Sequence, residues 1–149
     1  MPSSELARKT LDRRLAALRQ LEVPLPPRGW VRALREALGM SAADLARRMG
    51  LTRQAVSQLE RSEAEGSIRL DTLRRAAEAL DSVLVYALVP KEALDDVVRA
   101  RARAVAERTI QGVEHTMALE AQSGGSGDRE RLVEELAERL AESGRLWSD

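Results

Sequence analysis

Five polar residues with helical spacing lie in the segment "GLTRQAVSQLERSEAEG", residues 50–66. They are Arg53, Gln54, Ser57, Gln58 and Arg61. Positions three and four apart share one face of a helix, so these side chains should form a single stripe. Glutamine can pair with adenine through two hydrogen bonds, and arginine can do the same with O6 and N7 of guanine. The stripe therefore has the chemistry and the width to contact base edges in a DNA major groove.

The element that positions such a stripe is a helix-turn-helix, and residues 42–59 have its pattern. Ala46 is small where the two helices would cross, and Gly50 stands where the turn needs a positive φ. Ser41 and Thr52 are expected N-caps, and the backbone N–H groups at these two helix starts can hold phosphates. The residues spaced to fill the core between the helices are Leu45, Leu51, Val56 and Leu59.

The composition of the 149 residues, 44% hydrophobic and 32% charged, is typical of a soluble, helix-rich domain with appendages. The lack of cysteine excludes disulfides, thiolate metal sites and cysteine catalysis. It is compatible with a reducing cytosol, so we expect a cytoplasmic protein. The longest uncharged apolar stretch, residues 82–90, is too short to span a membrane, and the N-terminal segment lacks the apolar core of a signal peptide.

The formal net charge is zero but unevenly distributed along the chain. Residues 1–61 hold twelve Lys and Arg against six Asp and Glu, whereas residues 62–149 hold twelve against eighteen. Halves of opposite sign suggest different partners, and the basic half is expected to hold a polyanion. Ordinary solvated helix surface is the alternative explanation.

The pattern of apolar residues and helix breakers predicts a mainly α protein with helical extensions on both sides of a central domain. Four helices are expected in that domain, with "SEAEG" as a loop after the third. In the long helical region the apolar residues step mostly by four, so its apolar face should drift, or the helix should break near Gly112. The predicted segments are an N-terminal helix and proline-rich linker (1–27), the helix-turn-helix domain (28–81), a strand (82–90), a long helical region (91–122), a flexible linker (123–128), and a C-terminal helix and tail (129–149).

The segment "SVLVYALVP", residues 82–90, differs from the helices because it is rich in β-branched residues and stops at Pro90. A single strand cannot satisfy its own backbone N–H and C=O groups, and the helical block offers no second strand. We therefore expect the same strand of a second subunit to be its partner, which makes the protein a homodimer. The expected dimer strand residues are Val83, Leu84, Val85, Tyr86 and Leu88.

Catalytic and metal-binding patterns are weak. His115 is the only histidine and lies in a predicted helix without a glycine-rich turn, so a structural or interface role is favoured. A zinc site needs several His or Cys ligands. The acidic pairs 95–96 and 134–135 are helical neighbours, whose side chains point apart. We expect no enzymatic activity, no catalytic residue, no metal and no cofactor.

Residues 34–60, "LREALGMSAADLARRMGLTRQAVSQLE", resemble the phage-repressor or xenobiotic-response-element class of helix-turn-helix domain. The resemblance implies that Arg53, Gln54, Ser57 and Gln58 face base edges and that the start of the preceding helix touches phosphate. The class also has an Arg and a Glu at the positions of Arg35 and Glu60, and this ion pair would tie the first helix to the recognition helix. Ala42 is a departure, because a glutamine that contacts DNA often stands there.

Two further resemblances concern partners. "LVYALVPKE" is similar to the strand of HipB-like antitoxins, which pairs across a dimer. The stretches "VPLPPRGWVRALREALGM", "LERSEAEGSIRLDTLRRAAEALD" and "HTMALE" resemble the mobile mystery protein A family, whose members are typically encoded beside a Fic-domain protein. This resemblance implies an antitoxin-like role. Some Fic inhibitors carry Ser or Thr four residues before a Glu-Gly pair, but Arg61 stands at that position.

Two functions from different classes are compatible with the sequence. The first is a sequence-specific regulator of transcription that binds double-stranded DNA at a palindromic operator as a homodimer and represses the operon of a Fic-type toxin. The second is a protein-interaction scaffold that binds its partner without specific DNA binding. The stripe, the caps and the turn together favour the first function, whereas Ala42 and the neutral net charge favour the second.

Overall fold

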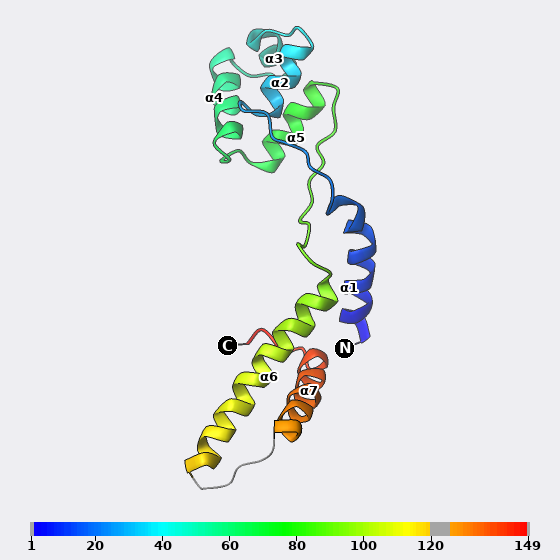
Figure 1. The fold of residues 1–149 in the computed structure, drawn as a ribbon. Helices are drawn as coiled ribbons and strands as arrows, with labels where there is room; N and C mark the ends of the chain where they lie inside the picture. Colours follow the sequence, from blue (N-terminus) through cyan, green and yellow to red (C-terminus); the bar gives the residue numbers. More distant parts are fainter. Residues whose placement is uncertain (1, 120–125, 149) are drawn as a thin grey trace. The chain divides into compact units, whose positions relative to one another are not determined.

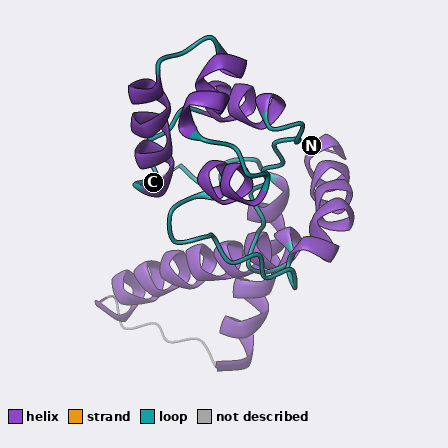
Figure 2. Ribbon diagram, turned by 90° about the horizontal axis from the view of Figure 1, so that it is seen from above, coloured by secondary structure: helices purple, strands orange, loops and turns teal. Residues whose placement is uncertain are grey.

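The computed structural model describes residues 2–119 and 126–148. These residues fall into two compact units, one comprising Glu22–Leu88 and the other formed by the residues up to Leu21 together with those from Val89 onward. Within the described ranges the chain consists of helices and loops without a strand (Figure 2). The prediction of a mainly α protein is therefore confirmed.

The unit Glu22–Leu88 contains the four helices that the periodicity predicts (Figure 1). They are α2 (Trp30–Ala37), α3 (Ala42–Met49), α4 (Arg53–Ala64) and α5 (Leu70–Ala79). All four contribute apolar side chains to one core, and burying such side chains from water is the main stabilising contribution to a small bundle. The buried core residues are Val31, Leu45, Ala46, Val56, Leu59, Ala76 and Leu80.

The turn between α3 and α4 has the local geometry expected of a helix-turn-helix. Gly50 ends α3 in the left-handed conformation, with a φ of 67° that favours a residue without a Cβ atom. The hydroxyl of Thr52 then accepts a hydrogen bond from the backbone N–H of Ala55 at 3.1 Å and caps α4. Ala46 is buried beside this turn and leaves room for the two helices to approach each other closely.

Helix α4 is longer than expected. It continues to Ala64, so the first residues of "SEAEG" are helical and only its end leads into a loop. The expectation of a loop was wrong because the side chain of Glu63 is buried against another helix, and this tertiary contact stabilises the extra turn.

The second unit contains α1 (Pro2–Leu15), a 3-10 turn (Ala16–Leu18), α6 (Leu94–Leu119) and α7 (Ser126–Glu142). Helices α6 and α7 pack along each other, and α1 packs against α6 (Figure 1). Among its described residues this unit buries few apolar side chains, and two of them are alanines. Its apolar core is therefore smaller than that of the four-helix unit. The buried apolar residues are Ala102, Ala106, Val133 and Leu146.

Side chains of the N-terminal segment hold the start of α6. The backbone N–H of Leu94 donates to both carboxylate oxygens of Asp12, at 3.0 and 2.9 Å, so Asp12 caps a helix that begins 82 residues later. Arg19 donates to Asp12 at 2.6 Å and to the carbonyl of Pro90 at 3.2 Å. Arg8 pairs with Asp95 in the first turn of α6. These contacts replace the local N-cap that the sequence before α6 lacks.

In the C-terminal region, the structure decides one open alternative and corrects one expectation. Helix α6 runs without interruption through Gly112, because one glycine costs a long helix only about 1 kcal/mol. Helix α7 begins at Ser126, so the last residues of the predicted linker 123–128 are helical; an acidic residue such as Asp128 in the first turn favours a helix start. The rest of that linker lies outside the described residues.

Residues 82–90 form a loop in the single chain, not the predicted strand. The physical reason is that a ladder of backbone hydrogen bonds needs a second strand, and the described chain is otherwise helices and loops. The large side chains of this segment are strongly exposed: Val83 by 86%, Val85 by 83% and Leu88 by 90%. Tyr86 is exposed as well, and Leu84 is half-buried.

Candidate nucleic-acid interface

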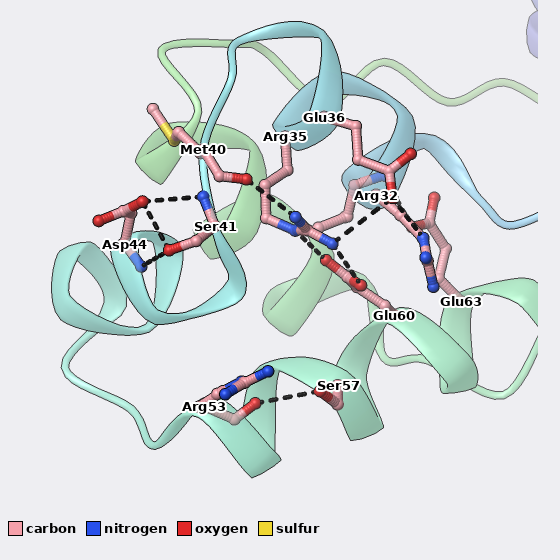
Figure 3. A network of polar contacts seen from close by, with 11 residues as sticks. Arg32, Arg35, Glu36, Met40, Ser41, Asp44, Arg53, Ser57, Glu60 and Glu63 are labelled. Carbon is pink, nitrogen blue, oxygen red and sulfur yellow. Dashed lines mark hydrogen bonds and ion pairs between the residues drawn. The ribbon is translucent and has the colours of Figure 1, made fainter.

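The outer face of α4 carries all five polar residues of the predicted stripe. The structure brings together Arg53, Gln54, Ser57, Gln58 and Arg61, each of them exposed to solvent. The backbone carbonyl of Arg53 accepts a hydrogen bond from the hydroxyl of Ser57 at 3.2 Å (Figure 3). While it makes this bond, Ser57 offers its oxygen lone pairs outward, which suits a base amino group.

The inner face of the same helix is buried. Val56 and Leu59 enter the core, and the carboxylates of Glu60 and Glu63 are also turned inward. The buried and exposed positions alternate with the helical period, so one helix separates an anchoring face from a free polar face. Its acidic residues at 60 and 63 are thus buried, whereas Arg53 and Arg61 are exposed to solvent.

An ion pair connects α2 to α4. Nε of Arg35 donates to Oε1 of Glu60 at 2.5 Å, and Nη2 donates to Oε2 at 3.1 Å, which is a two-point contact with fixed geometry (Figure 3). Nη1 of Arg35 also donates to the carbonyl of Met40 at 2.9 Å. The hydrogen bond to Glu60 raises the pKa of Arg35, so the buried guanidinium stays charged. These are the two residues that the resemblance pairs.

A second carboxylate connection between the two helices was not foreseen from the sequence. Oε1 of Glu63 accepts a hydrogen bond from the backbone N–H of Trp30 at 2.7 Å, and Oε2 accepts one from the N–H of Val31 at 2.9 Å. Glu63 thus caps the N-terminus of α2. The residue before α2 is Gly29, which has no side chain that could cap the helix. This missing local cap is the one feature of the sequence that could have indicated a cap from elsewhere in the chain.

The N-terminus of α3 is closed by a capping box. The hydroxyl of Ser41 accepts from the backbone N–H of Asp44 at 3.1 Å, and the carboxylate of Asp44 accepts from the N–H of Ser41 at 2.8 Å. The hydrogen bonds from Ser41, and to a lesser degree the nearby Arg47, lower the pKa of Asp44. A negative charge therefore already stands at the helix start where a phosphate was expected.

The N-terminus of α4 is more favourable for a phosphate. Thr52 caps one N–H group through its hydroxyl, and the N–H groups of Arg53 and Gln54 in the first turn have no partner inside the helix. The positive end of the helix dipole lies here, and Arg53, the first residue of α4, adds a positive charge to the same turn. Of the two predicted phosphate positions, Thr52 thus has the better electrostatic setting and Ser41 the poorer one.

The charge division expected from the two halves of the sequence does not follow the units of the fold. The unit Glu22–Leu88 holds ten arginines and nine Asp and Glu, which is close to neutral. Basic residues before position 22 belong to the other unit. What distinguishes α4 is therefore the placement of its charges, with arginines outward and two glutamates inward, and not the net charge of the domain.

Comparison with known proteins gives a match to one family model. Residues 31–84 match the family described as Helix-turn-helix. These residues lie within the unit Glu22–Leu88 and include the whole of α3, α4 and α5. No curated protein and no solved structure matches the chain. The match supports a DNA-binding regulator of transcription and is not to a family of enzymes.

Proposed function

We propose that this protein is a sequence-specific DNA-binding regulator of transcription that uses α4 as its recognition helix. The observation that carries the proposal is the free outer face of α4, where Arg53, Gln54 and Gln58 are exposed while the opposite face is anchored to the core. The match of residues 31–84 to a helix-turn-helix family supports the same conclusion.

The side chains of this face have distinct roles in the proposed complex. Arg53, Gln54, Ser57 and Gln58 contact base edges in the major groove, since their donors and acceptors suit guanine and adenine. Arg61, at the end of the stripe, contacts the edge of the groove. The first-turn N–H groups of α4, beside Thr52, bind a backbone phosphate, and Ser41 is the weaker phosphate contact because Asp44 lies beside it.

The test begins with a duplex that the wild-type chain enriches from a library with a randomised core. Its affinity is compared with that of a scrambled duplex over a series of salt concentrations. Specific binding should weaken by about 1–3 kcal/mol in Arg53→Ala and in Gln54→Ala. Arg108→Ala and Gln111→Ala are matched controls, because both side chains are exposed on α6 in the other unit. Unchanged affinity in both α4 variants would show that the reading face is assigned wrongly.

We also propose that residues 82–90 pair with the same residues of a second copy. Four large side chains, Val83, Val85, Tyr86 and Leu88, are exposed in the single chain. Strand pairing would bring them beside their counterparts in the second copy and give the backbone groups of the segment hydrogen-bond partners. Two recognition helices would then meet the two halves of a palindromic operator about one helical turn apart. Val85→Pro should yield monomers in light scattering, and an unchanged dimer would refute strand exchange.

The proposed biological setting is an antitoxin-like autorepressor paired with a Fic-domain protein. Its support is the resemblance of several stretches of the chain to the mobile mystery protein A family. The first observation to make is whether a Fic-domain reading frame lies beside the gene. The second is whether co-expression of the chain relieves the toxicity of that protein and whether the chain represses its own promoter.

The alternative is a scaffold that holds a protein partner without specific DNA binding. The near-neutral charge of the unit Glu22–Leu88 favours it, since unspecific attraction to DNA needs an excess of positive charge. Failure to enrich any duplex, together with the lack of a salt-dependent affinity, would support the scaffold over the regulator.

A further inference from the structure

The C-terminal half of the recognition helix is attached to α2 at two points one helical turn apart. Glu60 binds Arg35, and Glu63 binds the backbone at the start of α2. Gln58 and Arg61, two residues of the proposed DNA-contacting stripe, are exposed on the same half of the helix. Any tilt of this half of the helix would therefore move Gln58 and Arg61 relative to DNA.

Both carboxylate oxygens of Glu63 accept a hydrogen bond. Oε1 accepts from the N–H of Trp30 at 2.7 Å and Oε2 from the N–H of Val31 at 2.9 Å, and the residue is only 7% exposed. A buried carboxylate that lacked these bonds would be strongly unfavourable. The carboxylate of Glu63 lies at the N-terminus of α2, where the positive end of the helix dipole stabilises a negative charge.

The backbone before α2 is shaped around this carboxylate. Gly29 has a φ of 87° and a ψ of 164°, a conformation that is essentially restricted to glycine. A Cβ atom built on Gly29 would lie 2.7 Å from Oε2 of Glu63, closer than side-chain atoms approach. The glycine therefore both lacks a cap of its own and leaves the space that the carboxylate fills.

We infer that Glu63 is a positioning residue for DNA reading, an inference that rests on the proposed function of α4. By capping α2 from the last turn of α4, it fixes the angle at which Gln58 and Arg61 are presented. The extension of α4 to Ala64 has this role, because Glu63 lies in the turn that the sequence pattern assigned to a loop. Glu63 itself faces away from DNA and acts through the helix that carries it.

The experiment compares Glu63→Gln with the matched control Glu65→Gln. Glutamine keeps the shape but loses the charge and can offer only one acceptor oxygen to the two N–H groups. Glu65 is an exposed acidic residue at the end of the same helix, so its replacement removes the same charge without removing a cap. Binding is measured with the duplex enriched by the wild type and with its scrambled counterpart, at a temperature where circular dichroism shows each variant folded.

We expect Glu63→Gln to weaken binding to the enriched duplex by about tenfold and to change binding to the scrambled duplex by less than about twofold. Glu65→Gln should leave the ratio of the two affinities unchanged. Amide hydrogen exchange at Trp30 and Val31 should accelerate in Glu63→Gln alone. If Glu63→Gln does not fold, Glu63→Asp takes its place, because it keeps the charge with a shorter reach. It should lower the ratio of the affinities for the enriched and the scrambled duplex, but by less than about tenfold.

The outcomes separate this inference from the proposed function. A wild-type chain that enriches no duplex refutes the proposed function, and the role of Glu63 falls with it. A wild type that binds specifically, together with a Glu63→Gln variant of equal specificity but lower melting temperature, leaves the proposed function standing and reduces Glu63 to a structural cap. A selective loss of specific binding supports the positioning role.

Discussion

The guanidinium of Arg35 donates two hydrogen bonds to the carboxylate of Glu60, at 2.5 Å from Nε to Oε1 and at 3.1 Å from Nη2 to Oε2. Both side chains are almost completely removed from solvent. A buried pair of this kind adds little net stability over apolar residues of similar volume, but the loss of one partner leaves a buried charge uncompensated. The pair therefore fixes how α2 and α4 pack more than it strengthens the fold.

The first prediction tests this pair. Arg35→Met should lower the free energy of unfolding of the unit Glu22–Leu88 by about 3–5 kcal/mol, because Glu60 is left buried without a partner. The double variant Arg35→Met with Glu60→Leu should recover most of that loss. Urea denaturation followed by the fluorescence of Trp30, in a Trp147→Phe background, measures both. A loss below about 1 kcal/mol in the single variant would contradict a buried, charged pair.

The second prediction concerns Gly29. Gly29→Ala should destabilise the same unit by about 1–3 kcal/mol from backbone strain alone, with a further loss because the Cβ atom meets Glu63. Gly66→Ala is the matched control. It has a positive φ of 76° but open space around the added Cβ atom, so its loss should be the smaller of the two. Equal losses in the two variants would argue against the close approach of Glu63.

The third prediction concerns Gly112 in the middle of α6. Nothing lies within 4 Å of a Cβ atom built there, and no strained backbone conformation is involved. Gly112→Ala should therefore raise the stability of α6 by about 0.5–1 kcal/mol, since alanine has the higher helix propensity. Thermal unfolding followed by circular dichroism measures the change. A decrease in stability would indicate that the glycine is needed for a contact outside the single chain.

The fourth prediction concerns Asp12, which caps α6 from α1. Asp12→Ala removes the acceptor for the N–H of Leu94 and the partner of Arg19. We expect a loss of about 1–2 kcal/mol and faster hydrogen exchange in the first turn of α6. Glu5→Ala is the control, because Glu5 pairs with an exposed lysine one turn away on the same helix. Similar losses in both variants would exclude a specific capping role.

The fifth prediction concerns the pH dependence of the α3 capping box. The hydrogen bonds from Ser41 lower the pKa of Asp44 in the folded chain. A carboxyl whose pKa is lower in the folded state stabilises the fold above its unfolded pKa, and this contribution disappears as the pH falls through the folded pKa. The stability advantage of wild type over Asp44→Asn should thus be constant above about pH 5 and shrink below about pH 4. Urea denaturation across this range measures it, and a difference independent of pH would contradict the assignment.

Much of the helix-turn-helix could be predicted because its determinants are local. The caps by Ser41 and Thr52 join groups three residues apart, and Gly50 meets a requirement of a single turn. The separation of an outer polar face from an inner apolar face of α4 follows from helical spacing. The polar stripe could therefore be located from residue types and offsets.

Only the tertiary structure decided which distant groups meet. Glu63 accepts hydrogen bonds from backbone groups more than 30 residues earlier, and Asp12 caps a helix 82 residues later. A backbone N–H group does not depend on the type of side chain, so no spacing of residue types in the sequence predicts such caps. The same applies to charge. The division into two units combines part of the basic half with part of the acidic half, so the unit Glu22–Leu88 is near neutral. The sequence by itself determined the helices of the helix-turn-helix domain, the local caps of α3 and α4, and the stripe, because neighbouring residues specify them. The fold decided the length of α4, its attachment to α2 and the caps of α2 and α6, because these depend on packing between distant segments.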